Sequence, residues 1–270
     1  MKIILSRKGF DSENGSQPNP IMPDGTLLSL PIPDDDGNNT LASLEWNGMS
    51  FYDIIKQLKP KTYLEPNRCC HLDPDLRKET KNRMTGWKPA FGQSDIALKH
   101  LQNNSVGEGD LFLFFGWFKE TEKGKDGLLR YKRKSRDLHV IYAYMQIGEI
   151  IKPMDNPYEW LKDHPHIGDR KQRNDKPNVI FLPSDTLSLL SGYKGCDVLT
   201  YRENRVLTNI ENYKSRTYWD LPDCFRDVEI SYHPHPWKNG YFKSADKGQE
   251  FVMEATPEIL NWAKQIIKKD

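Results

Sequence analysis

The chain has 270 residues, of which 37% are hydrophobic and 11% aromatic, so it is long enough to bury a core and too rich in rings to be disordered,. No apolar run approaches the roughly 20 residues of a membrane-spanning helix, and Arg7 and Lys8 follow the first apolar residues too closely for a secretion signal,. The net charge of +1 gives no whole-molecule attraction to nucleic acid, so any such binding must come from a local patch,. We therefore expect a soluble globular protein.

The cysteines indicate a reducing compartment. Cys69 and Cys70 are adjacent, a spacing that seldom forms a structural disulfide, and Cys196 and Cys224 complete no C-x-x-C pair,. A cytoplasmic location is the simplest interpretation.

The first 40 residues predict one short strand followed by a long loop. Residues 2–5 (Lys-Ile-Ile-Leu) read as a buried strand, and residues 6–11 follow at its C-terminal end. From there Pro, Gly, Asn and Asp recur too often for a helix or a central strand,. Because apolar residues such as Ile21 and Leu28 interrupt this stretch, we expect it to pack against the protein.

Two short helices are expected next. Residues 50–53 (Ser-Phe-Tyr-Asp) have capping-box spacing, and apolar residues continue on one helical face until Pro60 ends the helix,. A second helix is expected to begin at Ser94 and to continue through Leu101,.

The second half is rich in predicted strands. Residues 111–115 and 139–147 are β-rich runs joined by a charged, glycine-containing segment, which predicts two paired strands,. Residues 179–182 form another buried strand, after which Ser184 is expected to cap a brief helix over residues 187–190,.

The C-terminal pattern predicts a strand and then a helix. Residues 250–254 alternate like a strand, and Thr256 caps a helix that has Pro257 at its first position and an apolar stripe through Ile267,. The order of elements predicts an α+β fold: a mixed, strand-rich sheet or partly open barrel with peripheral helices.

We expect a single compact domain over residues 1–270. The alternative is a subdivision near residue 105, with a loop-rich part over residues 1–105 and a strand-rich part over residues 106–270.

Several motifs, in chain order, resemble a known family. They are residues 6–12 (Ser-Arg-Lys-Gly-Phe-Asp-Ser), 20–25 (Pro-Ile-Met-Pro-Asp-Gly), 71–75 (His-Leu-Asp-Pro-Asp), 91–93 (Phe-Gly-Gln), 109–117 (Gly-Asp-Leu-Phe-Leu-Phe-Phe-Gly-Trp), 181–184 (Phe-Leu-Pro-Ser), 207–208 (Leu-Thr) and 215–222 (Ser-Arg-Thr-Tyr-Trp-Asp-Leu-Pro). With them the chain resembles, over its whole length, the third family of nucleotide-modification-associated domains. The resemblance implies a role near DNA base modification in phages or bacteria. Because the family is tied to that role mainly by genomic context, it implies no particular reaction.

A second, local similarity concerns residues 109–115 and the later strand that ends at Gly148. This pair looks like the strands of PUA-like modules such as EVE and ASCH domains, which are similar in reading a modified base in a pocket of a small barrel. It implies a PUA-like second half and, as an alternative function, a non-catalytic reader of modified bases.

Polar and charged side chains gather after the first strand, at Ser6, Arg7, Lys8 and Asp11. Ligand sites often lie at the C-terminal ends of strands, where Arg and Lys can bind phosphate. The alternative, which the sequence leaves open, is that Arg7 and Lys8 pair with loop carboxylates such as Asp24 and fix the loop in place.

His71 and Asp73 are two residues apart, so in an extended segment both side chains point to one face,. Such a pair can orient an imidazole for general-base catalysis or bind a metal. The alternative is a turn that starts at Asp73 and Pro74, with Asp75 capping the next segment.

From the sequence we expect no metal site and no stoichiometric zinc. Two His-Pro-His elements, residues 164–166 and 233–235, place imidazoles on one face of an extended chain, and His71 is the next candidate ligand,. No Cys or Glu stands at a familiar ligand spacing, so ordinary loops are the preferred interpretation. Cys69 and Cys70 are expected to be buried and inert, and no glycine-rich phosphate loop of the dinucleotide or ATP type occurs,.

A basic segment lies between two predicted strands. Between Lys119 and Arg136, eight Lys or Arg oppose three Asp or Glu, and aromatic rings are interleaved. The residues expected to bind phosphates of nucleic acid are Lys132, Arg133, Lys134 and Arg136,. The alternative is a solvated hairpin tip.

Together these features predict one pocket that holds a nucleotide or a nucleic-acid base. Residues expected to bind the substrate are Ser6, Arg7, Lys8, Gln93 and Trp117, and residues expected to carry out acid–base chemistry are His71, Asp73 and Asp11,. An enzyme is the leading hypothesis; a non-catalytic PUA-like reader and an interaction protein are the alternatives. The sequence leaves open the reaction, the cofactor, the base, the choice of DNA over free nucleotide, and the oligomeric state.

Overall fold

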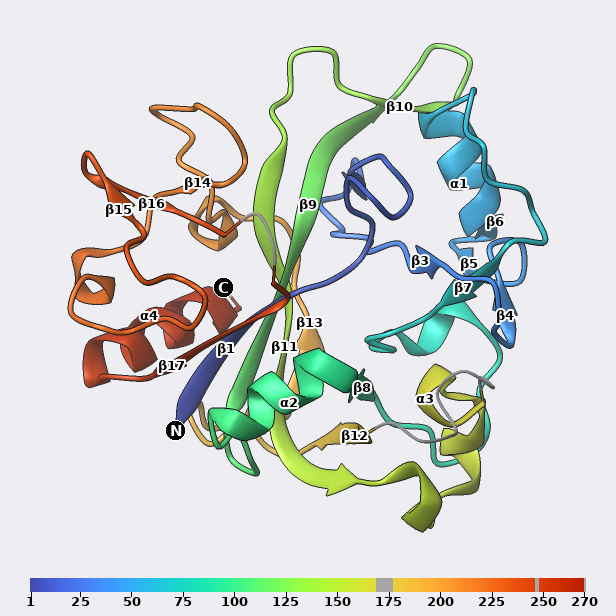
Figure 1. Cartoon of the computed structure of the whole chain (residues 1–270). Helices are drawn as coiled ribbons and strands as arrows, with labels where there is room; N and C mark the ends of the chain where they lie inside the picture. Colours follow the sequence, from blue (N-terminus) through green and yellow to red (C-terminus); the bar gives the residue numbers. More distant parts are fainter. Residues whose placement is uncertain (169–176, 246–247, 270) are drawn as a thin grey trace.

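The computed structural model describes residues 1–168, 177–245 and 248–269. Within these residues a curled, mixed sheet of nine strands forms the centre, with its main path in the order β17-β1-β9-β11-β12-β8 (Figure 1). The strands of this path are β17 (Glu250–Glu254), β1 (Lys2–Arg7), β9 (Leu111–Lys123), β11 (Leu138–Ile151), β12 (Asn178–Pro183) and β8 (Phe91–Ser94). Three more strands pair with it: β2 (Asn19–Ile21) and β10 (Leu129–Tyr131) with β9, and β13 (Cys196–Val198) with β11.

Smaller sheets and short helices surround this centre. The small sheets contain β3 (Ile32–Pro33), β4 (Asn39–Thr40) and β7 (Cys69–His71); β5 (Glu45–Trp46) and β6 (Met49–Ser50); and β14 (Tyr218–Trp219), β15 (Trp237–Lys238) and β16 (Tyr241–Lys243). The α-helices are α1 (Phe51–Leu58), α2 (Asp95–Asn103), α3 (Pro165–Gly168) and α4 (Pro257–Ile267). Short 3-10 helices are η1 (Lys78–Thr80), η2 (Pro153–Asp155), η3 (Glu159–Asp163), η5 (Glu203–Arg205) and η6 (Asp223–Phe225).

The sheet is buried on both faces, which explains why its strands are continuous apolar runs. On β1, Ile3 and Leu5 belong to the core cluster that includes the apolar stripe of α4, whereas Ile4 belongs to the cluster that includes the apolar side of α2. Alternate side chains of one strand therefore serve two cores. In Figure 1, α4 lies beside β17 and β1, and α2 lies beside β8.

The loop that follows β1 is ordered, as its apolar residues predicted, and a buried amide holds it together. Asn19 Oδ1 accepts hydrogen bonds from the backbone N–H groups of Leu30 (2.7 Å) and Phe10 (3.3 Å). Asn19 Nδ2 donates to the carbonyl oxygen of Trp117 in β9 (2.9 Å). One side chain thus joins both halves of the loop to the central sheet.

The predicted α+β class is confirmed, as are the helices with clear caps. Ser50 Oγ accepts from the N–H of Asp53 (3.0 Å) at the start of α1, and Thr256 Oγ1 accepts from the N–H of Ile259 (3.3 Å) at the start of α4.

The helix predicted over residues 187–190 is wrong. Ser184 Oγ donates to the carbonyl of Thr186 (2.8 Å) instead of accepting from a helical N–H group, and the N–H of Leu187 bonds to the carbonyl of Tyr193 (2.9 Å). The segment is therefore a turn that closes on itself, because hydrogen bonds across it replace those along a helix.

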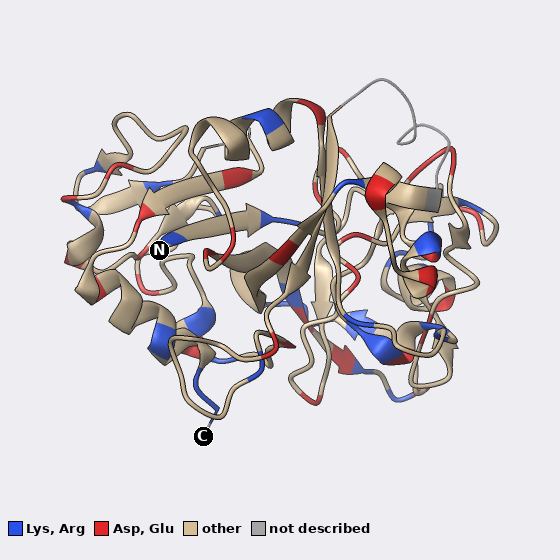
Figure 2. Ribbon diagram, turned by 90° about the horizontal axis from the view of Figure 1, so that it is seen from below, with Lys and Arg blue, Asp and Glu red and all other residues tan. Residues whose placement is uncertain are grey.

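No helix in the described part of the chain is long and apolar enough to cross a membrane. All four cysteines are free thiols. Figure 2 shows Lys and Arg interspersed with Asp and Glu along the ribbon, as expected for a net charge of +1.

An aromatic cluster at the junction of β8, β9 and β12 gives a stability prediction. The ring of Phe112 lies 5.0 Å from that of Phe91 and 5.2 Å from that of Phe181. Replacing Phe112 by Ala should lower the free energy of unfolding by about 3–5 kcal/mol, because it removes a fully buried ring. Urea unfolding measures this change. Met154→Ala is the control, since that side chain is 89% exposed and should change the free energy of unfolding by less than about 0.5 kcal/mol,. A loss below about 1 kcal/mol for the Phe112 variant would contradict the packing described.

Candidate functional site

A pocket of about 750 Å³ opens where β1 ends and the first loop begins. Its walls come from residues 7–14, from the end of β7 and the residues after it, from β8, from β9 and from α3. Its volume lies in the range of sites that bind small molecules.

The structure brings together most of the residues predicted for the site. Those that line the pocket are Arg7, Lys8, Asp11, His71, Asp73, Gln93 and Trp117. Ser6 is fully buried within β1 and does not line it. Parallel pairing of β1 with β9 explains part of this convergence, because it carries the two strands to the pocket side by side.

A compact group of His71, Asp73 and His166 forms one wall. His71 Nε2 lies 3.3 Å from His166 Nε2 and 3.9 Å from Asp73 Oδ2, and His166 Nε2 lies 3.6 Å from Asp73 Oδ2. His71 ends β7, and His166 comes from α3, which contains part of the first His-Pro-His element. Among the described residues, these three form a group with the spacing to hold a metal ion.

Neighbouring groups fix the orientation of this wall. Asp73 Oδ1 accepts the N–H of Gly92 (2.7 Å) and lies 3.4 Å from His164 Nε2. His166 Nδ1 bonds to Asn178 Oδ1 (2.7 Å), and Asn178 Nδ2 donates to the carbonyl of His166 (2.8 Å). Because the second bond fixes the amide, Nδ1 of His166 carries the proton and its Nε2 presents a lone pair.

The surroundings lower the pKa values of two members of this group, Asp73 and His166. Burial alone would raise the pKa of Asp73, but the hydrogen bond from His164 and the charges of the nearby histidines hold it well below its usual range,. Burial lowers the pKa of His166 to about 4, although Asp73 opposes this shift. At neutral pH the wall therefore combines an ionised carboxylate with a neutral imidazole.

The charge of Lys8 is balanced by a buried carboxylate. Its Nζ pairs with Oε1 of buried Glu250 at 2.7 Å, so a strand carboxylate rather than a loop carboxylate such as Asp24 holds it. Gln93 Nε2 donates to the same Oε1 (2.7 Å), and Gln93 Oε1 accepts from the N–H of Ser94 (3.2 Å). The amide predicted to read a base is thus engaged in positioning Glu250.

Arg7 and Asp11 are also tied into the protein. Arg7 Nη2 donates to the carbonyl of Ala245 (2.6 Å). Asp11 Oδ1 accepts the N–H groups of Glu13 (2.8 Å) and Asn14 (2.6 Å), which closes a tight turn at the pocket edge,. These bonds favour a turn-forming role for Asp11 over acid–base chemistry.

An arginine and an indole face each other at the rim. The guanidinium carbon of Arg216 lies 4.3 Å from the ring centre of Trp117, and Arg216 Nη2 donates to Ser12 Oγ (2.6 Å). Trp117 Nε1 donates to Asp137 Oδ1 (2.9 Å), which fixes the indole. A cation and a flat ring are therefore already in place where a ligand would enter.

His139 is a further, unpredicted residue of the pocket. Its Nδ1 accepts the Nε1–H of Trp219 (3.0 Å), and its side chain is almost fully buried. Burial, and secondarily the charges of Arg7 and Arg216, hold the pKa of His139 well below its usual value. The imidazole is neutral and carries its proton on Nε2.

The connection from β10 to β11 carries the four residues predicted to bind nucleic acid: Lys132, Arg133, Lys134 and Arg136. Lys132 Nζ pairs with Glu120 (2.7 Å), and the guanidinium of Arg136 lies 5.1 Å from the ring centre of Tyr213. Arg133 and Lys134 are exposed. Two of the four cations are therefore held at the surface, and the other two project into solvent.

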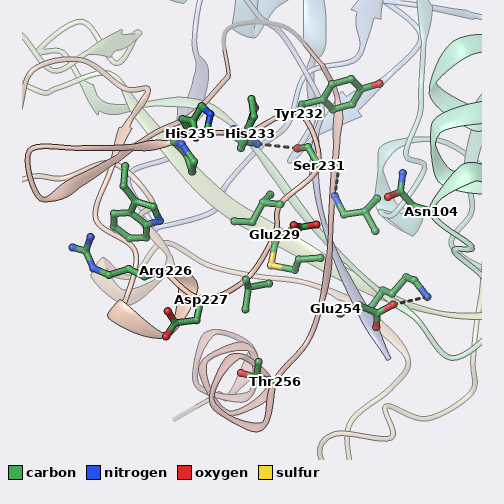
Figure 3. Close-up of a pocket in the computed structure, with 18 residues that line it drawn as sticks. Asn104, Arg226, Asp227, Glu229, Ser231, Tyr232, His233, His235, Glu254 and Thr256 are labelled. Carbon is green, nitrogen blue, oxygen red and sulfur yellow. Dashed lines mark hydrogen bonds and ion pairs between the residues drawn. The ribbon is translucent and has the colours of Figure 1, made fainter.

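A larger hollow of about 1120 Å³ lies elsewhere and contains the second His-Pro-His element (Figure 3). His233 bonds through Nδ1 to the carbonyl of Ser231 (2.9 Å) and accepts the N–H of Ala245 at Nε2 (2.8 Å), so both of its nitrogens are engaged. Figure 3 shows Arg226 and Glu254 spread over different walls of the hollow. Because its polar groups do not converge, we favour the smaller pocket.

The sequence matches a family model described as nucleotide modification associated domain 3 over residues 2–254. The chain belongs to this family. Membership confirms the resemblance drawn from the sequence motifs and associates the chain with nucleotide modification. No curated protein and no solved structure matches the chain.

Several residues of the pocket lie outside the predicted set: His139, His166, Arg216 and neighbouring Glu250. A signal exists for three of them. His166 belongs to the first His-Pro-His element, Arg216 stands within the motif of residues 215–222, and Glu250 is a carboxylate at the edge of an apolar strand. Asp73 and His166 are far apart in the sequence, so no local pattern indicates that they lie close together in the fold.

The neutral state of His139 gives a pH prediction. The pKa of His139 is lowered in the folded protein. Below the unfolded value of about 6.5, the unfolded chain therefore binds a proton that the folded chain does not. The free energy of unfolding must then decrease as the pH is lowered. Between pH 6.5 and 5.5, wild type should lose about 1 kcal/mol more free energy of unfolding than His139→Gln. Urea unfolding across this range measures the difference, with pH 8 as the reference for an intact fold. Equal losses in both proteins would show that His139 titrates normally.

Proposed function

We propose that this chain binds a nucleotide or nucleic-acid base in the 750 Å³ pocket and acts on it as an enzyme of nucleotide modification. One observation carries the proposal: the His71–Asp73–His166 group lines the same pocket as the Arg216–Trp117 pair. The pair offers a positive charge for phosphate and a ring for a base, and the group offers reactive atoms.

The geometry favours catalysis over reading. A reader needs an aromatic cage with hydrogen-bonding groups, whereas this wall places two imidazole nitrogens and a carboxylate oxygen 3.3 to 3.9 Å apart. Burying polar and charged groups close together lowers the stability of a fold. Clusters of this kind occur most often at functional sites.

The basic connection supports a polynucleotide as substrate. Asp137, which fixes Trp117, directly follows Arg136, so the cations of residues 132–136 lead to the residue that anchors the rim of the pocket. Exposed cations beside a ring can follow a phosphate backbone while a base enters the pocket.

Binding in this pocket is tested with Arg216→Ala. Deoxynucleoside monophosphates and a short single-stranded oligonucleotide are added to wild type and variant, and thermal shift measures binding, since a ligand at 100 times its Kd adds about 2.7 kcal/mol. The variant should bind at least about tenfold more weakly, because it loses a charge-assisted contact.

Arg226→Ala is the matched control. That guanidinium also lies over an indole, 4.0 Å from the ring centre of Trp237, but outside this pocket. It should leave binding within about twofold of wild type. Equal losses in both variants, or no stabilisation of wild type by any probe, would count against the site.

The basic connection is tested through salt dependence. Replacing both Arg133 and Lys134 by Ala should reduce the slope of log affinity against log salt for single-stranded DNA by about 1.4, because two phosphate contacts are lost. Fluorescence anisotropy at several salt concentrations measures the slope. A control that replaces the distant exposed Lys99 and Lys268 removes the same charge and should keep the slope. An unchanged slope in the Arg133 and Lys134 variant would indicate that these cations only keep the protein soluble and do not contact phosphates.

Catalysis is separated from reading by comparing wild type with His71→Asn. Each is expressed in a bacterial host, and the nucleosides of its DNA and nucleotide pool are analysed by mass spectrometry. Wild type should give a new nucleoside mass that the variant does not. A wild type that binds single-stranded DNA and leaves every nucleoside unchanged would favour the reader.

A further inference from the structure

Three atoms that can bind a metal ion converge on one point in the pocket wall. Asp73 Oδ2 has two imidazole nitrogens near it, His166 Nε2 at 3.6 Å and His71 Nε2 at 3.9 Å, and the two nitrogens are 3.3 Å apart. His166 presents a lone pair here, because its Nδ1 proton is committed to Asn178. A lone pair and a carboxylate oxygen repel each other at this distance unless a positive centre lies between them.

A proton accounts for only part of this arrangement. His71 Nε2–H could donate to His166 Nε2 at 3.3 Å, but Asp73 Oδ2, at 3.9 Å, would then lie beyond hydrogen-bond range,. A metal ion serves all three atoms together. The point that lies in the plane of these three atoms at equal distance from each is about 2.1 Å from them, which is the usual distance from zinc to imidazole nitrogen or carboxylate oxygen,.

We infer that His71, Asp73 and His166 bind one divalent transition-metal ion. Two imidazoles select zinc, iron, cobalt and similar ions over magnesium and calcium, which prefer oxygen ligands. All three ligand residues line the pocket, so the remaining coordination positions face its interior, where water or a substrate oxygen can bind,. This inference does not rest on the proposed nucleotide.

The surroundings have the form of a supporting shell for such an ion. Asp73 Oδ1 is directed away from the metal position by the N–H of Gly92 and by His164 Nε2, which leaves Oδ2 to coordinate. Asn178 fixes the ring of His166. Groups that hydrogen-bond to metal-binding side chains in this way orient those side chains and tune the affinity of the site for the metal.

Gly92 shows how tightly the ring of His166 is placed. A Cβ at this position would lie 2.2 Å from two carbon atoms of the imidazole, closer than any real contact. Only glycine lets β8 donate its N–H to Asp73 while the ring of His166 packs across the strand,.

The sequence alone predicts no metal, because neither His-Pro-His element has a partner ligand at a familiar spacing. The fold supplies the partners to the first element from β7 and the residues after it. The second element stays separate, since both nitrogens of His233 bond to backbone groups.

The test uses the full chain stripped with a chelator, then titrated with Zn²⁺ and, separately, Co²⁺. Isothermal titration calorimetry and elemental analysis after gel filtration should give one ion per chain, and thermal shift should report stabilisation by the metal. His71→Ala and His166→Ala should each weaken binding at least about 100-fold, because each removes a ligand. His164→Ala should weaken it by about 10- to 100-fold, as a supporting contact does.

His235→Ala is the matched control from the other His-Pro-His element and should keep one ion per chain. Circular dichroism of the metal-free proteins checks that each variant is folded, and the wild-type stoichiometry decides the matter even if a variant is not. A stripped wild type that takes up neither metal would assign the group to a shared proton. One ion retained by both His71→Ala and His166→Ala, or lost from His235→Ala, would place the metal elsewhere.

Discussion

The parallel pairing of β1 with β9 is the constraint on which the site depends. It sets Arg7 opposite Phe115, so the first loop leaves the sheet beside the part of β9 that carries Trp117. Asn19 then bonds to the carbonyl of Trp117 and to the backbone of Phe10 and Leu30, which ties the pocket edge to the strand. Without this pairing the loop would have no reason to stay over the sheet, because its own sequence forms little regular structure.

A second, independent wall is built around a single carboxylate. Asp73 gathers His164 and His166 from α3 and the residue before it, His71 from β7, and the N–H of Gly92 from β8. Burying such a charge requires partners on every side, and the fold provides them from three segments. The pocket therefore combines two different constructions: a cation that lies over a ring, Arg216 on Trp117, and a wall of metal-type ligands around Asp73.

Local sequence patterns predict many of the helices and strands, but they do not predict contacts between residues that are far apart in the sequence. Caps at Ser50 and Thr256 and the apolar runs of β9 and β11 depend on residues close together in sequence, so those elements can be predicted. The turn after Ser184 cannot, because its hydrogen bonds reach across to Tyr193. In the site, strand-end charges and the His71–Asp73 spacing point to the right region. They do not reveal that Glu250 neutralises Lys8, since nothing along the chain relates two residues so far apart.

That buried ion pair also bears on which ligands the pocket prefers. A phosphate entering beside Lys8 meets a cation that Glu250 already balances, so it gains little net attraction there and must rely on the arginines,. Each additional negative charge on the ligand then adds repulsion from Glu250, and Lys8 offers it no further net attraction,. For the nucleotide ligand that we propose, this ion pair therefore favours a phosphate group of low charge, as in a monoester or a diester, over a triphosphate,.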